Sequence, residues 1–415
     1  MKKIISFLLV LLMAFSIVSC GDEINDTTQD TQTTETEVKY YEYYPYSMSA
    51  FHTVVDMPSR ILLIATGGIN YYSKVDGESY VFCFNPICQH KFQDNCVSAL
   101  FFNQGDTSNS VAYNSTTNRV YIGRGEKIYS MSFDASALRL ECSLGEDGDL
   151  SMFLYQRYLI RNLQCAGNNL YFMYRDDQNG NDRIFKYDIS SKKLSAVTPE
   201  GVWAMDFIVL DDYIFVKFLD TDNNIRFYTT DFDFSELKLS FELGEADDSI
   251  TGVGVYNGEK LYSKSGDKIY EFDPIEKTKK VVICDESVTA WSQTMAATQN
   301  GCYFSVYNPK VIGKDPRDNT DIYTSRNEIW KLSYDGKTQK VLDTPYCEIM
   351  SMNIVNGGVI VKCFYTYVKE GDTLKQKGGA FLFFEIDENG NFVNPKPIGE
   401  FANDAELIEF LSKFN

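Results

Sequence analysis

The chain has 415 residues, two to three times a typical domain length, and its 44% hydrophobic and 23% charged residues exclude wholesale disorder. Aromatic residues make up 14% of the chain, with 28 Tyr and 29 Phe against 3 Trp, which favours β-structure over helix bundles. The formal net charge is −19, so we expect no nucleic-acid partner, because its phosphates would be repelled.

The N-terminus has the composition of a bacterial export signal. Lys2 and Lys3 precede an apolar stretch, residues 4–18, which is short for a membrane-spanning helix. The segment that ends it, Ile17-Val18-Ser19-Cys20, resembles a lipobox, after which Cys20 would become the first mature residue and carry lipid such as palmitate. An ordinary cleaved signal with an incidental Cys is the alternative. We therefore predict a signal peptide over 1–19 and a protein anchored to the bacterial cell membrane by Cys20, facing outside the cytoplasm.

Residues 20–38 follow as a polar segment, dense in Thr, Asp, Glu and Gln. Such a segment cannot bury enough apolar surface to offset its ordering entropy. We expect a disordered acidic tether between the lipid and the folded part. Without residues 1–19 the chain loses two lysines and no acid, so its net charge becomes −21.

The remaining chain repeats itself at intervals of 41 to 57 residues. Short apolar strands follow a turn at seven places, centred on Tyr71, Tyr121, Tyr171, Phe215, Tyr262, Tyr303 and Ile360. In each repeat a second strand carries an aromatic residue ahead of an Asp or Asn, which can close a turn through its side chain. The pairs are Phe82/Asn85, Tyr129/Asp134, Phe185/Asp188, Tyr228/Asp231, Tyr270/Asp273, Trp330/Asp335 and Phe384/Asp387.

Each repeat has room for two further strands, such as 203–210 before the turn and 279–284 after the Asp. Four short strands per unit predict an all-β fold, a β-propeller of seven four-stranded blades over 39–402. Six or eight blades, and two tandem sandwiches, are the alternatives. Residues 40–46 could add a strand that closes the ring. Residues 403–415 predict a short C-terminal helix, with Asn403 or Asp404 as N-cap and Leu407, Leu411 and Phe414 on one face.

One concentrated group of metal-binding side chains follows Phe82, in the first repeat. Its members are Cys83, Cys88, His90 and Cys96. Three thiolates and an imidazole make a complete tetrahedral Zn²⁺ shell, which would be a closed structural site without a position for substrate. A disulfide between two of the three cysteines, such as Cys88–Cys96, fits an exported protein better, and unpaired thiols are the third interpretation.

The lipobox, acidic tether, repeats and Cys…Cys-x-His…Cys segment together resemble a family of lipid-anchored bacterial β-propellers of unknown function. The resemblance covers most of the mature chain, and its specific part is the four residues from Cys83 to Cys96. It implies a propeller fold and an external location, and it implies no activity.

Six other cysteines are scattered singly through strand-like segments, where we expect them to fill cores as small hydrophobic residues. They are Cys142, Cys165, Cys284, Cys302, Cys347 and Cys363.

The sequence offers little material for catalysis. His52 and His90 are its only histidines, and it contains no H-E-x-x-H, G-x-S-x-G or phosphate-binding glycine loop. Paired carboxylates for glycoside cleavage stay open, because 58 acids offer many pairs.

The predicted connections between second and third strands are long in four repeats, at 176–182, 220–224, 308–326 and 369–379, and would emerge on one face. The last two carry a basic cluster, which we interpret either as solvated lysines or as a rim that binds an acidic glycan, a teichoic polymer or a partner protein. Its members are Lys310, Lys314, Arg317, Arg326, Lys369, Lys375 and Lys377.

The sequence favours a non-enzymatic binding or scaffolding module at the cell surface, with a protein or glycan partner at the propeller face. The first alternative is an enzyme acting on carbohydrate or cell-wall polymer through carboxylates in the channel. The second is an extracytoplasmic sensor domain. The sequence names no certain cofactor, and structural zinc at Cys83, Cys88, His90 and Cys96 is the one candidate.

Overall fold

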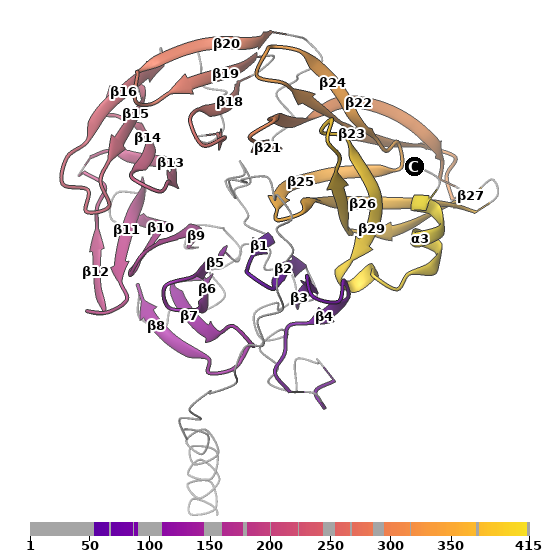
Figure 1. Cartoon of the computed structure of the whole chain (residues 1–415), viewed down its shortest axis with the longest axis horizontal. Coiled ribbons are helices and arrows are strands. Elements are labelled where there is room, and N and C mark those ends of the chain that lie inside the picture. The colour runs from indigo at the N-terminus through magenta and orange to yellow at the C-terminus, as the bar shows by residue number, and fades with distance from the viewer. Residues whose placement is uncertain are drawn as a thin grey trace, which may run out of the picture. The chain divides into compact units, whose positions relative to one another are not determined.

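The computed structural model describes residues 54–412, apart from 66–67, 86, 90–109, 145–159, 177–180, 200, 223, 244–253, 266–267, 285–293, 316 and 371–372. The described strands form seven antiparallel sheets, arranged around a common axis as the blades of a propeller (Figure 1). The prediction of seven four-stranded blades is confirmed. A fifth strand, β27, is added only in the last blade.

The first three blades contain strands β1 to β12: β1 (Val54–Asp56), β2 (Arg60–Ala65), β3 (Gly68–Ser73), β4 (Ser79–Val81); β5 (Ser110–Asn114), β6 (Arg119–Arg124), β7 (Lys127–Ser132), β8 (Arg139–Ser143); β9 (Arg161–Ala166), β10 (Asn169–Asp176), β11 (Asn181–Asp188), β12 (Lys193–Ala196). Blades four and five contain β13 (Trp203–Val209), β14 (Ile214–Leu219), β15 (Ile225–Thr230), β16 (Lys238–Leu243); β17 (Val255–Tyr256), β18 (Leu261–Ser265), β19 (Lys268–Asp273), β20 (Thr278–Cys284). Blades six and seven contain β21 (Met295–Thr298), β22 (Gly301–Lys314), β23 (Asp321–Leu332), β24 (Thr338–Asp343); β25 (Cys347–Val355), β26 (Gly358–Glu370), β27 (Thr373–Gly378), β28 (Phe381–Ile386), β29 (Phe392–Ile398).

The order of strands within a blade follows the chain, and the first strands labelled in Figure 1, β1, β5, β9, β13, β21 and β25, lie nearest the axis. Because neighbouring strands are antiparallel, first and third strands run in one direction and second and fourth strands in the other. We call the face where second strands end and third strands begin the insertion face. We call the opposite face, where first strands end, the cavity face.

Seven hydrophobic clusters hold the ring together, one between each pair of neighbouring blades. Six of them join consecutive blades, for example Ile208 and Phe227 of blade four with Phe272 of blade five. The seventh joins Ile61 and Leu63 of the first blade to residues of the last, such as Ile360. The ring is therefore closed by burial of apolar surface between its first and last blades.

The seam between the last and first blades uses side chains and isolated backbone groups. The Asn356 N–H donates to Asp56 Oδ2 at 2.9 Å, and the Gly399 N–H donates to Ser79 Oγ at 3.0 Å. Tyr72 stacks on Phe383 with ring centroids 5.6 Å apart. Among the strands that the structure describes, none belongs to a blade from the other end of the chain.

The predicted Asp turns are confirmed between third and fourth strands. Asp188 Oδ1 accepts hydrogen bonds from the Ser190 and Ser191 N–H groups, both at 2.9 Å. Hydrogen bonds from the Ser190 hydroxyl and these amides lower the pKa of Asp188 to about 2. The side chain thus closes the turn in its ionised form.

The alignment of the first repeat is wrong by one strand. Tyr71 lies on the third strand, β3, whereas the other six markers lie on second strands. Its turn carboxylate is Asp76, whose Oδ1 accepts from the Glu78 N–H at 3.0 Å. The true second strand, β2, reads Arg-Ile-Leu-Leu-Ile-Ala and carries no aromatic residue. The aromatic residue used as the marker, Tyr71, therefore lies on the next strand, β3.

The chain ends in a 3-10 turn, η4 (Gly399–Phe401), and one short helix, α3 (Ala405–Leu411), as predicted. Asp404 is the N-cap, since its Oδ1 accepts from the Leu407 N–H at 3.0 Å. Leu407 and Leu411 are buried against blades six and seven, whereas Phe414 lies outside the described residues. No helix in the described part of the chain is long and apolar enough to cross a membrane.

Candidate functional site

A cavity of about 590 Å³ opens near the axis, on the cavity face. It lies among the innermost strands of the first four blades, β1, β5, β9 and β13, and the turn between β9 and β10. Its volume falls in the range of small-molecule sites. It is lined by Val54, Val55, Asp56, Val111, Ala112, Tyr113, Leu163, Gln164, Cys165, Ala166, Gly167, Asn168, Asn169, Val209, Leu210, Asp211 and Phe232.

Two polar side chains of this cavity, Gln164 and Asp56, join neighbouring blades. Gln164 Oε1 accepts from the Val209 N–H at 2.8 Å, and its Nε2 donates to Phe207 O at 3.0 Å, so this side chain joins blades three and four. Asp56 forms an ion pair with Lys74 at 2.5 Å in addition to its seam contact. These contacts hold the cavity wall in place, and the polar atoms that make them already have partners within the protein.

Cys165 is the one thiol among the described residues of the cavity wall. Burial raises its pKa to about 12, so the sulfur is protonated at neutral pH. Because the thiolate is the nucleophilic form, Cys165 is chemically inert here. The cavity wall thus mixes apolar and polar side chains, and the thiol in it is unreactive.

On the insertion face, blades six and seven carry a projection that we call the wing, defined as residues 307–326 and 364–378. The sequence predicts long loops here, and this is wrong, because both segments are largely paired strands. Val311 pairs with Tyr323 in the β22–β23 hairpin, and Lys369 pairs with Leu374 in the β26–β27 hairpin. β-Branched and aromatic residues flank each turn and extend the strands, while Pro309 is accommodated by an irregular register.

The two hairpins of the wing pack against each other. A Cβ on Gly313 of β22 would lie 2.5 Å from Leu374 Cδ1 of β27, so glycine permits this close approach. Glu348 of β25 also accepts hydrogen bonds from the Ser325 N–H at 2.6 Å and from Arg326 Nε at 2.8 Å. The wing is thus braced to the last blade and lies at the outer margin of the ring (Figure 1).

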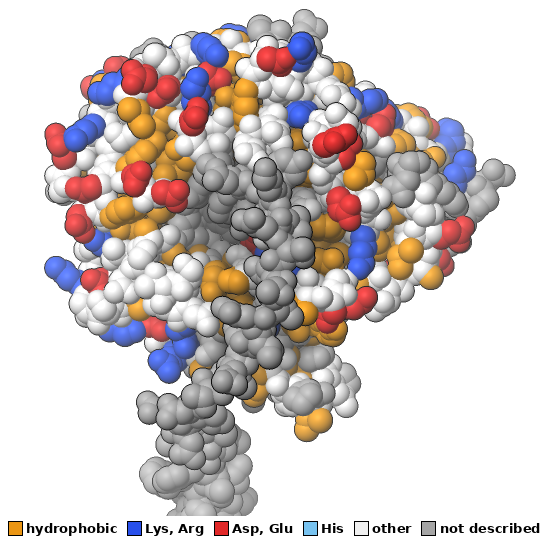
Figure 2. Space-filling model, viewed as in Figure 1, with side chains coloured by type: hydrophobic (Ala, Val, Ile, Leu, Met, Phe, Trp, Pro, Cys, Tyr) orange, Lys and Arg blue, Asp and Glu red, His pale blue; other side chains and the backbone are white. Residues whose placement is uncertain are grey.

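The predicted basic rim lies on this wing, and the structure brings its seven residues together, but most of their charge is neutralised. Lys369 is exposed; the other six each face a carboxylate. The ion pairs are Lys310 with Glu328 and Asp343, Lys314 with Asp321, Arg317 with Asp315, Arg326 with Glu348, Lys375 with Glu406, and Lys377 with Asp404 and Glu406. Acidic and basic side chains are interspersed over the face seen in Figure 2.

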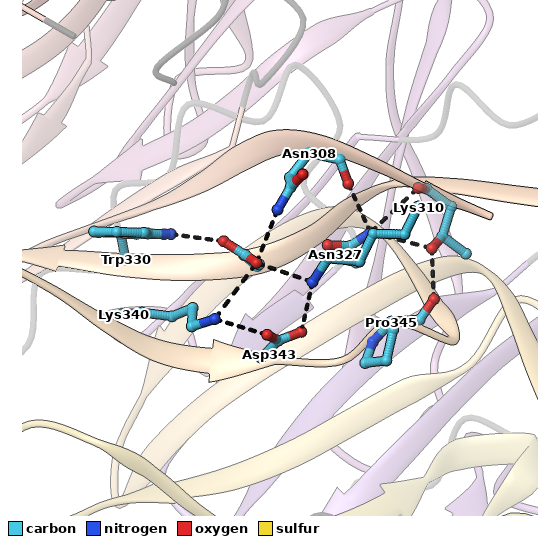
Figure 3. A network of polar contacts seen from close by, with 9 residues as sticks. Asn308, Lys310, Asn327, Trp330, Lys340, Asp343 and Pro345 are labelled. Atoms are coloured by element: carbon cyan, nitrogen blue, oxygen red, sulfur yellow. Dashed lines mark hydrogen bonds and ion pairs between the residues drawn. The ribbon is translucent and has the colours of Figure 1, made fainter. Parts of the chain in front are cut away.

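At the base of the wing, a buried carboxylate organises a polar network that the sequence did not reveal (Figure 3). Glu328 Oε1 accepts from Lys310 Nζ at 2.9 Å and from Asn308 Nδ2 at 3.0 Å, and Oε2 accepts from Trp330 Nε1 at 3.0 Å. Asp343 accepts from Lys310 at 3.0 Å and from Lys340 at 2.7 Å. The network joins β22, β23 and β24 where the hairpin leaves the blade.

The wing also exposes apolar and aromatic side chains, between 37% and 55% accessible: Tyr307, Val311, Tyr323, Phe364 and Tyr365. Val311 and Tyr323 are cross-strand partners, and Phe364 meets Tyr365 edge to face with centroids 4.3 Å apart. Exposed aromatic residues surrounded by charge pairs are typical of protein-binding surfaces.

The Cys83 segment is described only in part. Asn85 closes a turn, but after β4 rather than between the third and fourth strands: it accepts from the Ile87 N–H at 3.1 Å through its side chain and from the Cys88 N–H at 3.1 Å through its backbone. His90 and Cys96 lie outside the described residues, so zinc, disulfide and thiols all stay predictions. No group of three metal-binding side chains occurs within the described ranges.

Cysteines elsewhere follow the core prediction where they are described. Cys302, Cys347 and Cys363 are buried, and Cys142 and Cys165 are half-buried against the core between blades two and three. The Cys284 side chain lies outside the described residues, as do Cys20, His52 and residues 40–46.

No protein-family model matches the sequence, and no curated protein matches it. Solved structures resemble it at low identity. Sqt1 of Saccharomyces cerevisiae gives a TM-score of 0.47 at 8% identity, with 86% of this chain and 87% of that chain covered. A chain of the mitotic checkpoint complex gives 0.47 at 9%, with 79% and 90% covered. A chain of the nidogen/laminin complex gives 0.36 at 12%, with 55% and 76% covered.

Proposed function

We propose that this protein is a lipid-anchored propeller on the outer side of a bacterial cell membrane, where it acts as a non-enzymatic binding or scaffolding module. The lipobox ending in Cys20 and the acidic segment that follows support the location. The binding role rests on the wing.

The observation that carries the binding role is the set of exposed aromatic and apolar side chains on the wing: Tyr307, Val311, Tyr323, Phe364 and Tyr365. Large aromatic side chains contribute much of the energy of protein interfaces, because they bury a large area for little loss of side-chain freedom. Here they lie on paired strands braced by Glu328 and Glu348. A surface that is already ordered loses less conformational entropy when a partner binds. We therefore assign the wing to a protein partner.

Site-specific photocrosslinking in native host cells tests the wing. A photoreactive phenylalanine analogue at Tyr323 or Phe364 is expected to give a discrete adduct with one partner. The matched control is the same analogue at Ile275, which is 70% exposed in a turn of blade five. Equal labelling from Ile275, or no adduct from the wing, would contradict the assignment. A Tyr323→Ser, Phe364→Ser variant is expected to lose co-purification of the same partner while keeping its thermal midpoint.

Fractionation tests the anchor separately. Cys20→Ser is expected to remove incorporation of radiolabelled palmitate and to shift the protein from the membrane to the soluble or secreted fraction. Ser19→Ala, which leaves the lipidated position intact, is the control and is expected to stay on the membrane. If Cys20→Ser stays membrane-bound and labelled, the anchor proposal fails whatever the result for the wing.

A further inference from the structure

A second cluster of exposed and charged side chains lies on the insertion face, between blades three and four, far along the chain from the wing. Arg161 and Trp203 are the first residues of β9 and β13, the innermost strands of these blades. Asp182 lies at the start of β11 of blade three. Because first and third strands begin on the same face, all three residues lie on that face, and Arg161 and Trp203 are close to the axis.

The carboxylate of Asp182 positions the other two side chains. Its Oδ2 forms an ion pair with Arg161 Nη2 at 2.5 Å and accepts a hydrogen bond from Trp203 Nε1 at 3.3 Å. Asp182 is only 7% exposed, whereas the Arg161 side chain is 41% exposed and Trp203 is 36% exposed. A buried acid therefore holds a guanidinium and an indole side by side at the surface, each with part of its area open to solvent.

The backbone on both sides of the cluster is irregular. The pairing of β9 with β10 shifts register between Gln164 and Arg161, where Asn162 adopts a left-handed φ of 51°. The pairing of β13 with β14 shifts register just after Ala204, next to Trp203. Bulges of this kind re-aim neighbouring side chains and are frequent beside binding sites. Asn162 Nδ2 also donates to Asp206 Oδ1 and Phe207 O, both at 2.7 Å, which fixes the two bulged strands to each other.

We propose that Arg161, Asp182 and Trp203 form a binding subsite for a neutral oligosaccharide. An indole offers an apolar surface on which the C–H face of a pyranose ring can stack. A guanidinium has five N–H donors in a fixed fork, and the 41% exposed side chain of Arg161 can direct donors at sugar hydroxyl oxygens. The ion pair with Asp182 cancels the charge of Arg161, and the net charge of −19 opposes polyanions, so an uncharged sugar fits best.

One polar atom of the cluster is left without a partner. Asp182 Oδ1 is buried and accepts no hydrogen bond, although its neighbour Oδ2 is fully engaged. A buried carboxylate oxygen without a hydrogen-bond donor is energetically unfavourable, so a donor supplied by a ligand would stabilise it. Because Oδ1 is buried, a sugar hydroxyl would reach it only after a neighbouring side chain moved, so we expect ligand binding to rearrange the side chains around Asp182.

Tryptophan fluorescence tests the subsite, because the chain has only three tryptophans, Trp203, Trp291 and Trp330. The probes are triacetylchitotriose and maltotriose, titrated to about 10 mM so that a weak affinity is detected. We expect a saturable change in emission that is lost in Trp203→Phe and kept in Trp330→Phe. Arg161→Lys keeps the charge and loses the fork, and is expected to weaken binding by roughly tenfold or more.

The outcomes separate this inference from the proposed function. The Tyr323→Ser, Phe364→Ser variant of the wing is expected to keep the saccharide response, and Trp203→Phe is expected to keep the wing crosslink. No saturable change with either trisaccharide, or a change that survives in Trp203→Phe with native circular dichroism, overturns the proposal. A response to polygalacturonate alone overturns the assignment to neutral sugars.

Discussion

Replacement of Glu328 tests whether the polar network in Figure 3 carries the wing. In Glu328→Ala, Asn308 and Trp330 each lose a hydrogen bond, and Lys310 keeps only its ion pair with Asp343. The Glu328 residue is 5% exposed, so water replaces few of these contacts. The change therefore leaves donors of three half-buried side chains partly unsatisfied.

The expected loss follows from these contacts. Removing one partner of a buried ion pair costs about 3–5 kcal/mol, and the remaining contact of Lys310 with Asp343 reduces this to about 2–4 kcal/mol. Glu328→Gln keeps the shape and one acceptor, and is expected to lose about 1–2 kcal/mol. Chemical denaturation at neutral pH measures both values. The control is Glu242→Ala, whose side chain is 48% exposed and pairs with Arg226 at 3.2 Å, and which is expected to lose less than about 1 kcal/mol.

The pH dependence of this loss has a defined sign. Burial alone raises the pKa of Glu328, but hydrogen bonds from Lys310, Trp330 and Asn308 outweigh it and hold the pKa below its ordinary value of 4.5. The stabilisation by the carboxylate is therefore present above that value and is lost as the pH falls through the lowered pKa. The difference between wild type and Glu328→Gln should shrink on acidification. A stability loss in Glu328→Ala no greater than in Glu242→Ala, or a difference between wild type and Glu328→Gln that grows at low pH, would contradict this role of Glu328.

Three further predictions address the core, a buried lysine and the thiols. Leu407→Ala in α3 is expected to lower the free energy of unfolding by about 2–5 kcal/mol, measured by chemical denaturation. The same change at exposed Ile408 should lower it by about 0.5 kcal/mol or less. Equal losses would mean that the helix is not packed on the ring. Burial lowers the pKa of Lys362 to about 8 against 10.5 when exposed, so the unfolded chain binds more protons between these values and stability should rise with pH there. Lys362→Met should abolish that rise, measured by denaturation at pH values on either side of the window, and a rise that persists points to another group. Burial raises the pKa of Cys165 to about 12 and raises that of Cys302 further, so iodoacetamide should modify neither in the folded protein and both after unfolding, as read by mass spectrometry; modification of the folded protein would show that these thiols are accessible.

The sequence predicts the parts of this fold that depend on neighbouring residues. The period of the repeats and the Asp turns are local, since Asp188 closes its turn with amides two and three residues ahead. The first repeat departs because β2 carries no aromatic residue, although its apolar run packs as the other second strands do. A prediction of second strands from aromatic residues fails in this blade, because aliphatic residues fill the core there instead.

The wing and the rim depend on partners that are distant in sequence. Arg326 pairs with Glu348, and Lys377 pairs with Asp404 and Glu406, across separations of more than twenty residues. A count of lysines and arginines in one segment cannot include these acids, so the predicted basic patch is largely charge-paired in the folded protein. The cavity and the Arg161–Asp182–Trp203 cluster likewise arise only when the innermost strands of different blades are brought beside one another.

The seam between β1–β4 and β25–β29 bears on how the gene itself can be rearranged. Each described blade is a continuous stretch of chain. The position of the chain ends within the ring is therefore not fixed by the fold, as long as the blades keep their order. Joining residue 412 to residue 54 by a flexible linker and opening the chain at 199–202, between blades three and four, would leave every sheet uncut. Such circular permutants should fold, and because each blade is one stretch of chain, a whole blade is encoded by one continuous stretch of the gene.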